Sequence, residues 1–208
     1  MVKTLSIGPM PTNCYIFTDD NTGEMAIIDP AYNSLELQKA VENKKVKYIF
    51  VTHGHADHIF GLAKIKELTG AMVVCHKLEN IRLQSTAESL FDNLSGMYFE
   101  PFLKSTADIT VRGGEKFSVG DTEFEIMHTP GHTDGSVCLV SDEIIFSGDT
   151  VFNMSYGRVD FPTGSSQQMI SSFKKLFAIN GDRKVYPGHN GDTTLDFERK
   201  YNPMVAYL

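Results

Sequence analysis

Four potential metal ligands fall within six residues of this chain, directly after a short apolar stretch. They are His53, His55, Asp57 and His58, and the stretch before them is Tyr48–Val51. A strand over that stretch would deliver the ligands to the edge of a sheet, and residues two apart in extended chain project to the same side. Asp57 alone would be an ordinary helix cap. Three histidines with an aspartate at this spacing instead indicate a site for zinc, iron or manganese.

Three later turns repeat the combination of glycine with a ligand-type residue. A strand-like segment leads into each turn, and glycine directly precedes His132, Asp149 and His189. One such residue alone would be unremarkable in a turn. Their recurrence at four strand ends predicts a single polar site along one edge of a sheet, with enough donors for two ions.

Length and composition predict a single domain over residues 1–208. The chain is long enough and, at 41% apolar residues, apolar enough for a full core, and no linker or low-complexity block divides it. The N-terminus lacks the features of a signal peptide, and no apolar run approaches a membrane span. The formal charge of −7 argues against general binding to nucleic acid or anionic membrane. These features leave the oligomeric state open.

Three cysteines, Cys14, Cys75 and Cys138, lie far apart within apolar segments. An odd number of cysteines, together with the absence of an export signal, favours reduced thiols in a cytoplasm. We expect each of them to be a small core residue rather than a ligand.

Strand-like and helix-like segments alternate through the first half, and strands with hairpin turns dominate the second. The pattern predicts helices packed outside β-sheets. We expect helices at 35–41 (capped by Asn33 or Ser34), 57–68 and 168–178. We expect strands at 2–7, 13–18, 24–29, 48–51, 71–75, 117–119, 122–128, 137–140, 143–146 and 184–186.

Residues 76–107 have a weaker pattern, with short helices expected at 78–83 and 89–94 and a cluster of large apolar residues at 97–103. One interpretation is a small satellite core under a long connection, and the other is a lid or substrate wall. We expect His76 to lie at the surface or at a helix start. His128 has no expected ligand role and is assigned a structural or supporting one.

The motifs T-H-G-H-A-D-H, T-P-G-H-T, S-G-D-T and Y-P-G-H, in this order and spread over nearly the whole chain, resemble those of the metallo-β-lactamase superfamily of hydrolases. The resemblance implies an α+β fold, a four-layer αββα sandwich with two sheets face to face and helices outside. It also implies two divalent metal ions, zinc or else iron or manganese. One ion would be held by His53, His55 and His132. The other would be held by Asp57, His58 and His189, with Asp149 bridging and Asp29 supporting the ligands from behind.

The segment Tyr156–Gly164 resembles the G-R-x-D-F stretch of compact glyoxalase II-like thioester hydrolases, which persulfide dioxygenases share. Longer glyoxalase II enzymes add a C-terminal helical domain that holds glutathione. We expect that domain to be absent, since the chain ends 19 residues after His189. Tyr156 and Arg158 are candidates for contact with substrate. Arg158 either pairs with Asp160 and fixes the loop, which we favour, or meets a substrate carboxylate in a bidentate fashion.

These observations lead to the hypothesis of a binuclear hydrolase in which a metal-bound hydroxide, oriented by Asp57, attacks a small anionic acyl thioester. A thiolate leaves without a strong general acid because its pKa is only about 8.5. One alternative is a mononuclear iron persulfide dioxygenase that uses His53, His132 and Asp149. A lactonase of the same superfamily and a module with a purely structural metal are further alternatives, and the last is disfavoured by seven nitrogen and oxygen ligands facing loops.

Overall fold

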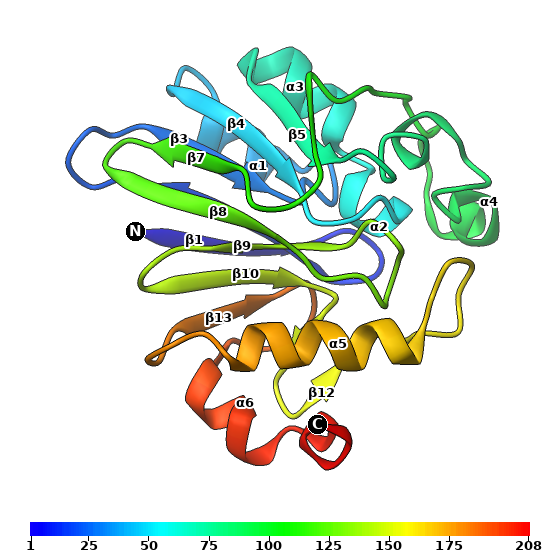
Figure 1. Ribbon diagram of the computed structural model, residues 1–208. Helices are drawn as coiled ribbons and strands as arrows, with labels where there is room; N and C mark the ends of the chain where they lie inside the picture. The colour runs from blue at the N-terminus through cyan, green and yellow to red at the C-terminus, as the bar shows by residue number, and fades with distance from the viewer.

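Two six-stranded sheets pack face to face in the computed structural model, which describes residues 1–208 (Figure 1). The first sheet is built by the N-terminal half of the chain. Its outer three strands are antiparallel, and from the third strand onward neighbouring strands run parallel. In spatial order the strands are β1 (Val2–Ile7), β2 (Thr12–Thr18), β3 (Met25–Ile28), β4 (Val46–Val51), β5 (Met72–His76) and β6 (Ile109–Val111).

The second sheet is built by the C-terminal half and is mostly antiparallel, with one parallel pair between β10 and β13. A two-stranded ribbon, β11 (Val151–Phe152) with β12 (Ser155–Tyr156), follows β10. In spatial order the strands of the sheet are β14 (Thr193–Thr194), β13 (Lys184–Pro187), β10 (Ile144–Gly148), β9 (Val137–Val140), β8 (Thr122–His128) and β7 (Lys116–Val119).

Helices cover the outer face of each sheet, which gives the four-layer αββα sandwich that the family resemblance implies (Figure 1). The first sheet carries α1 (Leu35–Val41), α2 (Ala56–Ile59) and α3 (Leu62–Thr69), and the second carries α5 (Ser166–Phe177) and α6 (Leu195–Tyr201). The long connection after β5 contains α4 (Phe91–Leu94) and the short 3-10 helices η1 (Arg82–Gln84) and η2 (Ser95–Met97). A third, η3 (Pro203–Tyr207), ends the chain.

Consecutive apolar residues in the central strands explain the layers, since side chains alternate between the two faces of a strand. In β4, Ile49 packs toward the helices while Phe50 packs toward the other sheet. Ile27 and Ile28 of β3 divide in the same way, and Phe146 of the second sheet belongs to the same central core as Ile28 and Phe50. Each sheet is therefore apolar on both faces and is buried between two layers.

The parallel strands bring five turns to one edge of the sandwich. Asp29 follows β3 and His53 follows β4, and these strands run parallel. Asp149 follows β10 and His189 follows β13, which also run parallel. The turn holding His132 follows β8, which points the same way as β10 because both are antiparallel to β9. Topology thus places all the expected ligands at one rim.

The helix expected over residues 57–68 is in fact two helices, broken at Phe60 and Gly61. The backbone nitrogen of Gly61 donates to the Pro30 carbonyl at 2.9 Å. A Cβ at position 61 would lie 2.7 Å from the Tyr32 carbonyl carbon, so only glycine allows this close approach. The apolar periodicity continues across the break, which is why the sequence pattern missed it.

Two expectations for the long connection were also wrong in detail. Residues 78–81 form turns, and only 82–84 are helical, as the 3-10 helix η1; the Asn80 side chain accepts a hydrogen bond from the Ala107 backbone nitrogen. His76, expected at the surface, is buried as the last residue of β5 and stacks on the His128 ring at a centroid distance of 4.3 Å. The sequence could not show this, because a short apolar strand before His76 is expected whether the end of that strand is exposed or covered by the second sheet.

None of the helices combines the length and the apolar character that crossing a bilayer would require.

The aromatic core between the sheets gives a prediction for stability. Phe146 is fully buried and contacts the rings of Tyr15, Phe124 and Tyr186 at centroid distances of 5.2, 6.0 and 5.4 Å. We expect Phe146→Ala to lower the free energy of unfolding by about 3–5 kcal/mol, measured by urea denaturation. Phe99→Ala is the matched control, because Phe99 is 99% exposed and its loss should change stability by less than about 0.5 kcal/mol. Equal losses in the two variants would contradict this view of the core.

Candidate metal centre

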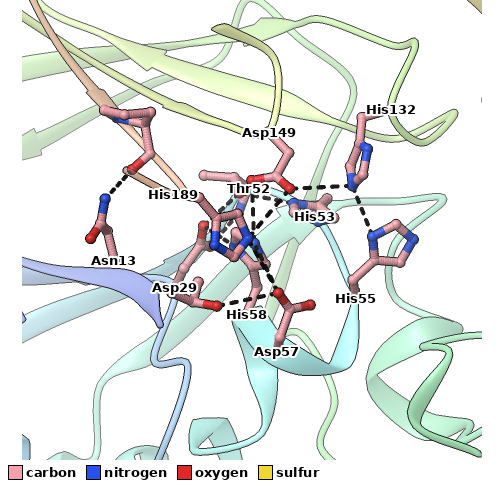
Figure 2. A network of polar contacts seen from close by, with 12 residues as sticks. Asn13, Asp29, Thr52, His53, His55, Asp57, His58, His132, Asp149 and His189 are labelled. Atoms are coloured by element: carbon pink, nitrogen blue, oxygen red, sulfur yellow. Dashed lines mark hydrogen bonds and ion pairs between the residues drawn. The ribbon is translucent and has the colours of Figure 1, made fainter. Parts of the chain in front are cut away.

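Three histidines from two turns form the first group of donors. His53 and His55 come from the loop after β4, and His132 comes from the turn after β8 (Figure 2). One ring nitrogen from each lies within 4.8 Å of the others. His132 Nε2 is 2.9 Å from His55 Nδ1. Three imidazole nitrogens converging in this way are a ligand set that suits zinc or iron.

A second group lies on the other side of Asp149 and consists of Asp57, His58 and His189. His189 Nε2 is 3.3 Å from Asp57 Oδ2, and His58 Nε2 is 3.8 Å from the same oxygen. Asp57 and His58 come from α2 at the edge of the first sheet, whereas His189 comes from the end of β13 in the second. This group therefore exists only where the two sheets meet.

Asp149 faces both groups. Its Oδ1 is 3.3 Å from His58 Nε2, and its Oδ2 is 3.5 Å from His132 Nε2 and 3.7 Å from His189 Nε2. All seven side chains named from the sequence thus lie in one cluster (Figure 2).

The donor chemistry of this cluster fits a metal. His53 Nε2, His58 Nε2 and Asp149 Oδ1 are buried and have no hydrogen-bond partner in the protein. Buried polar atoms are nearly always satisfied, because an unpaired one costs about 1–3 kcal/mol. Three such unpartnered atoms face one another in a cluster of histidines and aspartates, and metal cations would satisfy them best.

Asp29 and Thr52 fix the orientation of two imidazoles from behind. Asp29 Oδ2 lies 2.9 Å from His58 Nδ1 and accepts from the Thr52 hydroxyl at 2.6 Å. The Thr52 backbone nitrogen donates to Asp29 Oδ1 at 2.7 Å, and Thr52 Oγ1 is 3.2 Å from His53 Nδ1. These partners favour a proton on Nδ1 of each ring, so that Nε2, which faces the cluster, is the atom available to a metal. The supporting role expected for Asp29 agrees with this geometry; Thr52 was not anticipated.

Gly148 explains why Asp149 can approach so closely. Its backbone has φ +49°, a left-handed conformation, and any Cβ there would collide with the Thr52 side chain. The residue before Asp149 must therefore be glycine for the β10 turn to rest against the first sheet.

Two loops that carry ligands are held by partners that the sequence did not reveal. The carbonyl of Arg158 lies 2.7 Å from His132 Nδ1. Asn13, on β2, donates its side-chain amide to the carbonyls of Pro187 and Asn190 at 3.0 and 2.8 Å, on either side of His189. Figure 2 shows Asn13 beside this loop. The first sheet thus positions a ligand that belongs to the second.

The buried ion pair of Glu79 and Arg82 holds together the loops that carry the first group of donors. Glu79 Oε2 accepts from the Gly54 backbone nitrogen at 2.7 Å, and Oε1 accepts from the Thr133 hydroxyl at 2.7 Å and from Arg82 at 3.0 Å. Arg82 also donates hydrogen bonds to the side chains of Asp134 and Thr163. Burial raises the pKa of Glu79, and Arg82 with the hydrogen bonds offsets this only in part. The carboxylate therefore bridges the loops that carry His53, His55 and His132.

The electrostatics of His53, His55 and Asp149 suit ligation, whereas at His58 the carboxylates of Asp149 and Asp57 outweigh burial and raise the pKa well above its usual value. Burial, the largest influence, lowers the pKa of His53 well below its usual value and that of His55 to about 3. Burial alone would raise the pKa of Asp149, but the imidazoles of His58, His132 and His189 outweigh it and hold the pKa below its ordinary range. His53 and His55 are therefore neutral and Asp149 is ionised at neutral pH, which are the states that bind metals.

A pocket of about 790 Å³ opens beside the cluster, lined by Asp57, Asp149, His189 and both Tyr156 and Arg158. The Arg158 guanidinium donates two hydrogen bonds of 2.7 Å to the Asp160 carboxylate and lies 3.8 Å from the centre of the Phe161 ring. Arg158 thus adopts the pairing that we favoured from the sequence. His128, away from the cluster, has its Nε2 2.9 Å from the Asp134 carbonyl, which agrees with its expected structural role.

Comparison with known proteins places this arrangement in a family. A family model described as the metallo-beta-lactamase superfamily matches residues 7–189. The chain belongs to this superfamily. An uncharacterised protein of Aquifex aeolicus is 33% identical over 211 residues, which cover 100% of this chain and 98% of that protein. Hydroxyacylglutathione hydrolase GloC of Haemophilus influenzae is 28% identical over 98% of this chain and 97% of its own length.

Solved structures of the superfamily agree in fold. The B3 metallo-beta-lactamase BLEG-1 superposes with a TM-score of 0.90 at 29% identity, covering 99% of each chain. ETHE1 from Myxococcus xanthus gives 0.80 at 29% identity, covering 100% of this chain and 85% of its own. TTHA1623, solved in a di-iron-bound form, gives 0.84 at 27% identity over 97% of this chain and 98% of its own.

The position of Asp149 between the two donor groups of this superfamily member generates the first prediction for the site. We expect Asp149→Ala to retain one metal ion per chain instead of two and to lose most of its hydrolytic activity, because both groups lose an oxygen donor. Elemental analysis of protein loaded with excess zinc measures the stoichiometry. Retention of two ions would refute the bridging role.

The hydrogen bonds of Glu79 generate the second prediction for the site. We expect Glu79→Gln to lower zinc affinity roughly 10–100-fold at the group of His53, His55 and His132, as removal of outer partners does at other metal sites. Competition with a chelator measures the affinity.

Glu198→Gln is the matched control for that variant. Glu198 is also fully buried and holds the Thr193 hydroxyl at 2.7 Å and the Met154 backbone nitrogen at 3.1 Å, but it touches no loop of the first group. Its replacement should leave zinc affinity unchanged. Equal effects of the two variants would mean that Glu79 acts only through general stability.

Proposed function

We propose that this chain is a binuclear metal-dependent hydrolase that cleaves a small acyl thioester. The observation that carries the proposal is the carboxylate of Asp149, which faces two groups of donors with unpartnered atoms at the base of an open pocket. His53, His55 and His132 would hold one ion and Asp57, His58 and His189 the other, with Asp149 shared. We propose zinc as the metal, with iron or manganese as alternatives that the same donors accept.

Two divalent ions, when bound, supply a water of pKa about 7 and polarise a carbonyl group. The side chains of the protein do the rest. The pKa of Asp57 is lowered because His58 and His189 outweigh the effect of its burial, so its carboxylate is ionised beside the pocket. Thr12 donates to Asp57 Oδ2 at 3.2 Å and fixes its direction. In this proposal Asp57 orients the attacking water by accepting a hydrogen bond.

Thioesters fit this pocket better than amides because of the leaving group. Water adds to the carbonyl carbon, the carbon–sulfur bond breaks, and the products are a carboxylic acid and a thiol. A thiol has a pKa of about 8.5, so the thiolate leaves without a strong acid. The pocket lining has no lysine and no carboxyl group beyond Asp57 and Asp149. Cleavage of an amide or a phosphodiester would need additional protonation of the leaving group.

Charge supports an anionic substrate. Two divalent ions against Asp57, Asp149 and a hydroxide leave a net charge of about +1 by formal counting. In an acidic protein this local positive site would attract an anion, whether its charge lies on the acyl group or on the thiol carrier. The relative GloC is a hydroxyacylglutathione hydrolase, which agrees with a substrate of this class. The three buried cysteines are free, which supports a reducing compartment such as the cytoplasm.

A second candidate rests on a subset of the same residues. His53, His132 and Asp149 are two histidines and a carboxylate, the set that holds a single iron in non-haem oxygenases. Such an enzyme would oxidise a persulfide with molecular oxygen. The convergence of Asp57, His58 and His189 on a second position favours the hydrolase.

Metal content and oxygen uptake on the purified protein separate the two candidates. We expect two metal ions per chain, turnover of acyl thioesters, and no oxygen consumption with a persulfide, because both donor groups are complete. A chelator should abolish the activity, and added zinc should restore it. One iron per chain with oxygen uptake would establish the second candidate in place of the first.

A further inference from the structure

The pocket beside the donor cluster is walled mainly by apolar side chains that take no part in the cluster. They come from three separate segments, the turn after β1, the long connection around α4, and the connection between β10 and α5. We call six of these apolar side chains the wall of the pocket: Met10, Leu90, Leu94, Met97, Phe152 and Phe161.

The part of the wall that residues 90–97 contribute is held against the loop that carries His55 and Asp57. The backbone nitrogen of Ala56 donates to the Ser89 carbonyl at 2.8 Å. Phe91 and Tyr98 pack on Phe60, with ring centroids 5.7 and 4.3 Å away. One side of this segment is thus a satellite core, while the other side lines the pocket. The satellite core of the first interpretation is found, and the lid or substrate wall of the second stays a prediction for the side that lines the pocket.

Leu90 lies directly before α4 and lines the pocket. Its backbone has φ +61°, a left-handed conformation that branched side chains rarely adopt. Strained backbone of this kind persists where the surroundings enforce it, and it is frequent at ligand sites. Leu90 is the cap residue of α4, and Leu94 at the end of that helix and Met97 in η2 also line the pocket.

The wall offers little charge to a bound group. Arg158 is the one cationic side chain in the lining, and both of its hydrogen bonds to Asp160 and its stacking on Phe161 are already in place. Asn93, Ser155, Tyr156 and Asn190 can offer hydrogen bonds, but apolar side chains supply the larger share of the surface away from the metal cluster.

We propose that the acyl group of the substrate is an apolar chain or ring that packs on Leu90, Leu94, Met97 and Phe161. The negative charge of the substrate then belongs to the thiol carrier. This inference rests on the proposed thioester hydrolysis and names the class of acyl group that the same site accepts.

A series of thioesters on one small neutral thiol tests the proposal. Acetyl, butyryl, hexanoyl and octanoyl thioesters of N-acetylcysteamine are compared by kcat/KM with the zinc-loaded protein. Each methylene that leaves water for the wall should raise kcat/KM roughly threefold to fourfold. A constant or falling kcat/KM along the series would overturn the proposal while leaving thioester hydrolysis intact.

Variants of the wall locate the effect. In Leu94→Asn with Met97→Gln, which nearly preserves side-chain size, the gain per methylene should fall below about twofold. Met72→Gln is the matched control, because Met72 is 41% exposed, close to the 44% of Met97, but lies on β5 and does not line the pocket. Unchanged chain-length dependence in the double variant would show that the wall does not hold the acyl group.

Binding of inert analogues provides a readout that does not need turnover. S-alkyl thioethers of N-acetylcysteamine are titrated by calorimetry into metal-free and zinc-loaded protein. Affinity should rise with chain length in both forms, because the wall contains none of the metal donors. Equal affinities for short and long chains would overturn the proposal. If no thioester is hydrolysed, the proposed function fails, and this measurement still decides whether the wall binds apolar chains.

Discussion

Seven nitrogen and oxygen donors are gathered, mostly buried, at the seam between two sheets, where little water reaches them. His53 and His58 leave nitrogen atoms unpartnered, and Asp149 leaves an oxygen. Such a cluster is expensive without cations, since neither its lone pairs nor its carboxylates are fully satisfied by the protein. The surrounding structure can be understood as the means of holding these donors together despite that cost.

The support comes in layers of hydrogen bonds that cross between elements distant in sequence. Asp29 and Thr52 fix rings from the first sheet, and Glu79 with Arg82 joins the loops of the first donor group. Asn13 reaches from the first sheet to the His189 loop of the second. Every supporting group is itself buried or paired, so contacts within the protein hold the donors in place. Outer partners of this kind fix the orientation of ligands at metal sites.

Periodicity and turn residues were sufficient to predict most of the strands, the helices at 35–41 and 168–178, and the αββα sandwich that the family resemblance implied. The central strands were readable because runs such as Ile27-Ile28 and Ile49-Phe50 are apolar on both faces. The break at Gly61 and the burial of His76 were not readable. Both depend on a contact with a distant segment, Pro30 to Tyr32 in one case and the His128 ring in the other. The short strands β6, β11, β12 and β14 and the helix α6 were also missed, because elements of this kind are set more by their neighbours than by local propensity.

By itself the sequence determined which side chains could ligate and that their turns follow strands, because glycine, histidine and aspartate at strand ends carry a local signal. The family resemblance implied the two donor groups, but the residues by themselves left open which donors face one another. The tertiary structure decided it, since the second group joins α2 of one sheet to β13 of the other. It alone revealed Thr52, Glu79 and Asn13 as supports. A threonine, glutamate or asparagine has many ordinary uses, and its role is set by what lies within hydrogen-bond reach. That distance is fixed by packing between residues far apart in the chain.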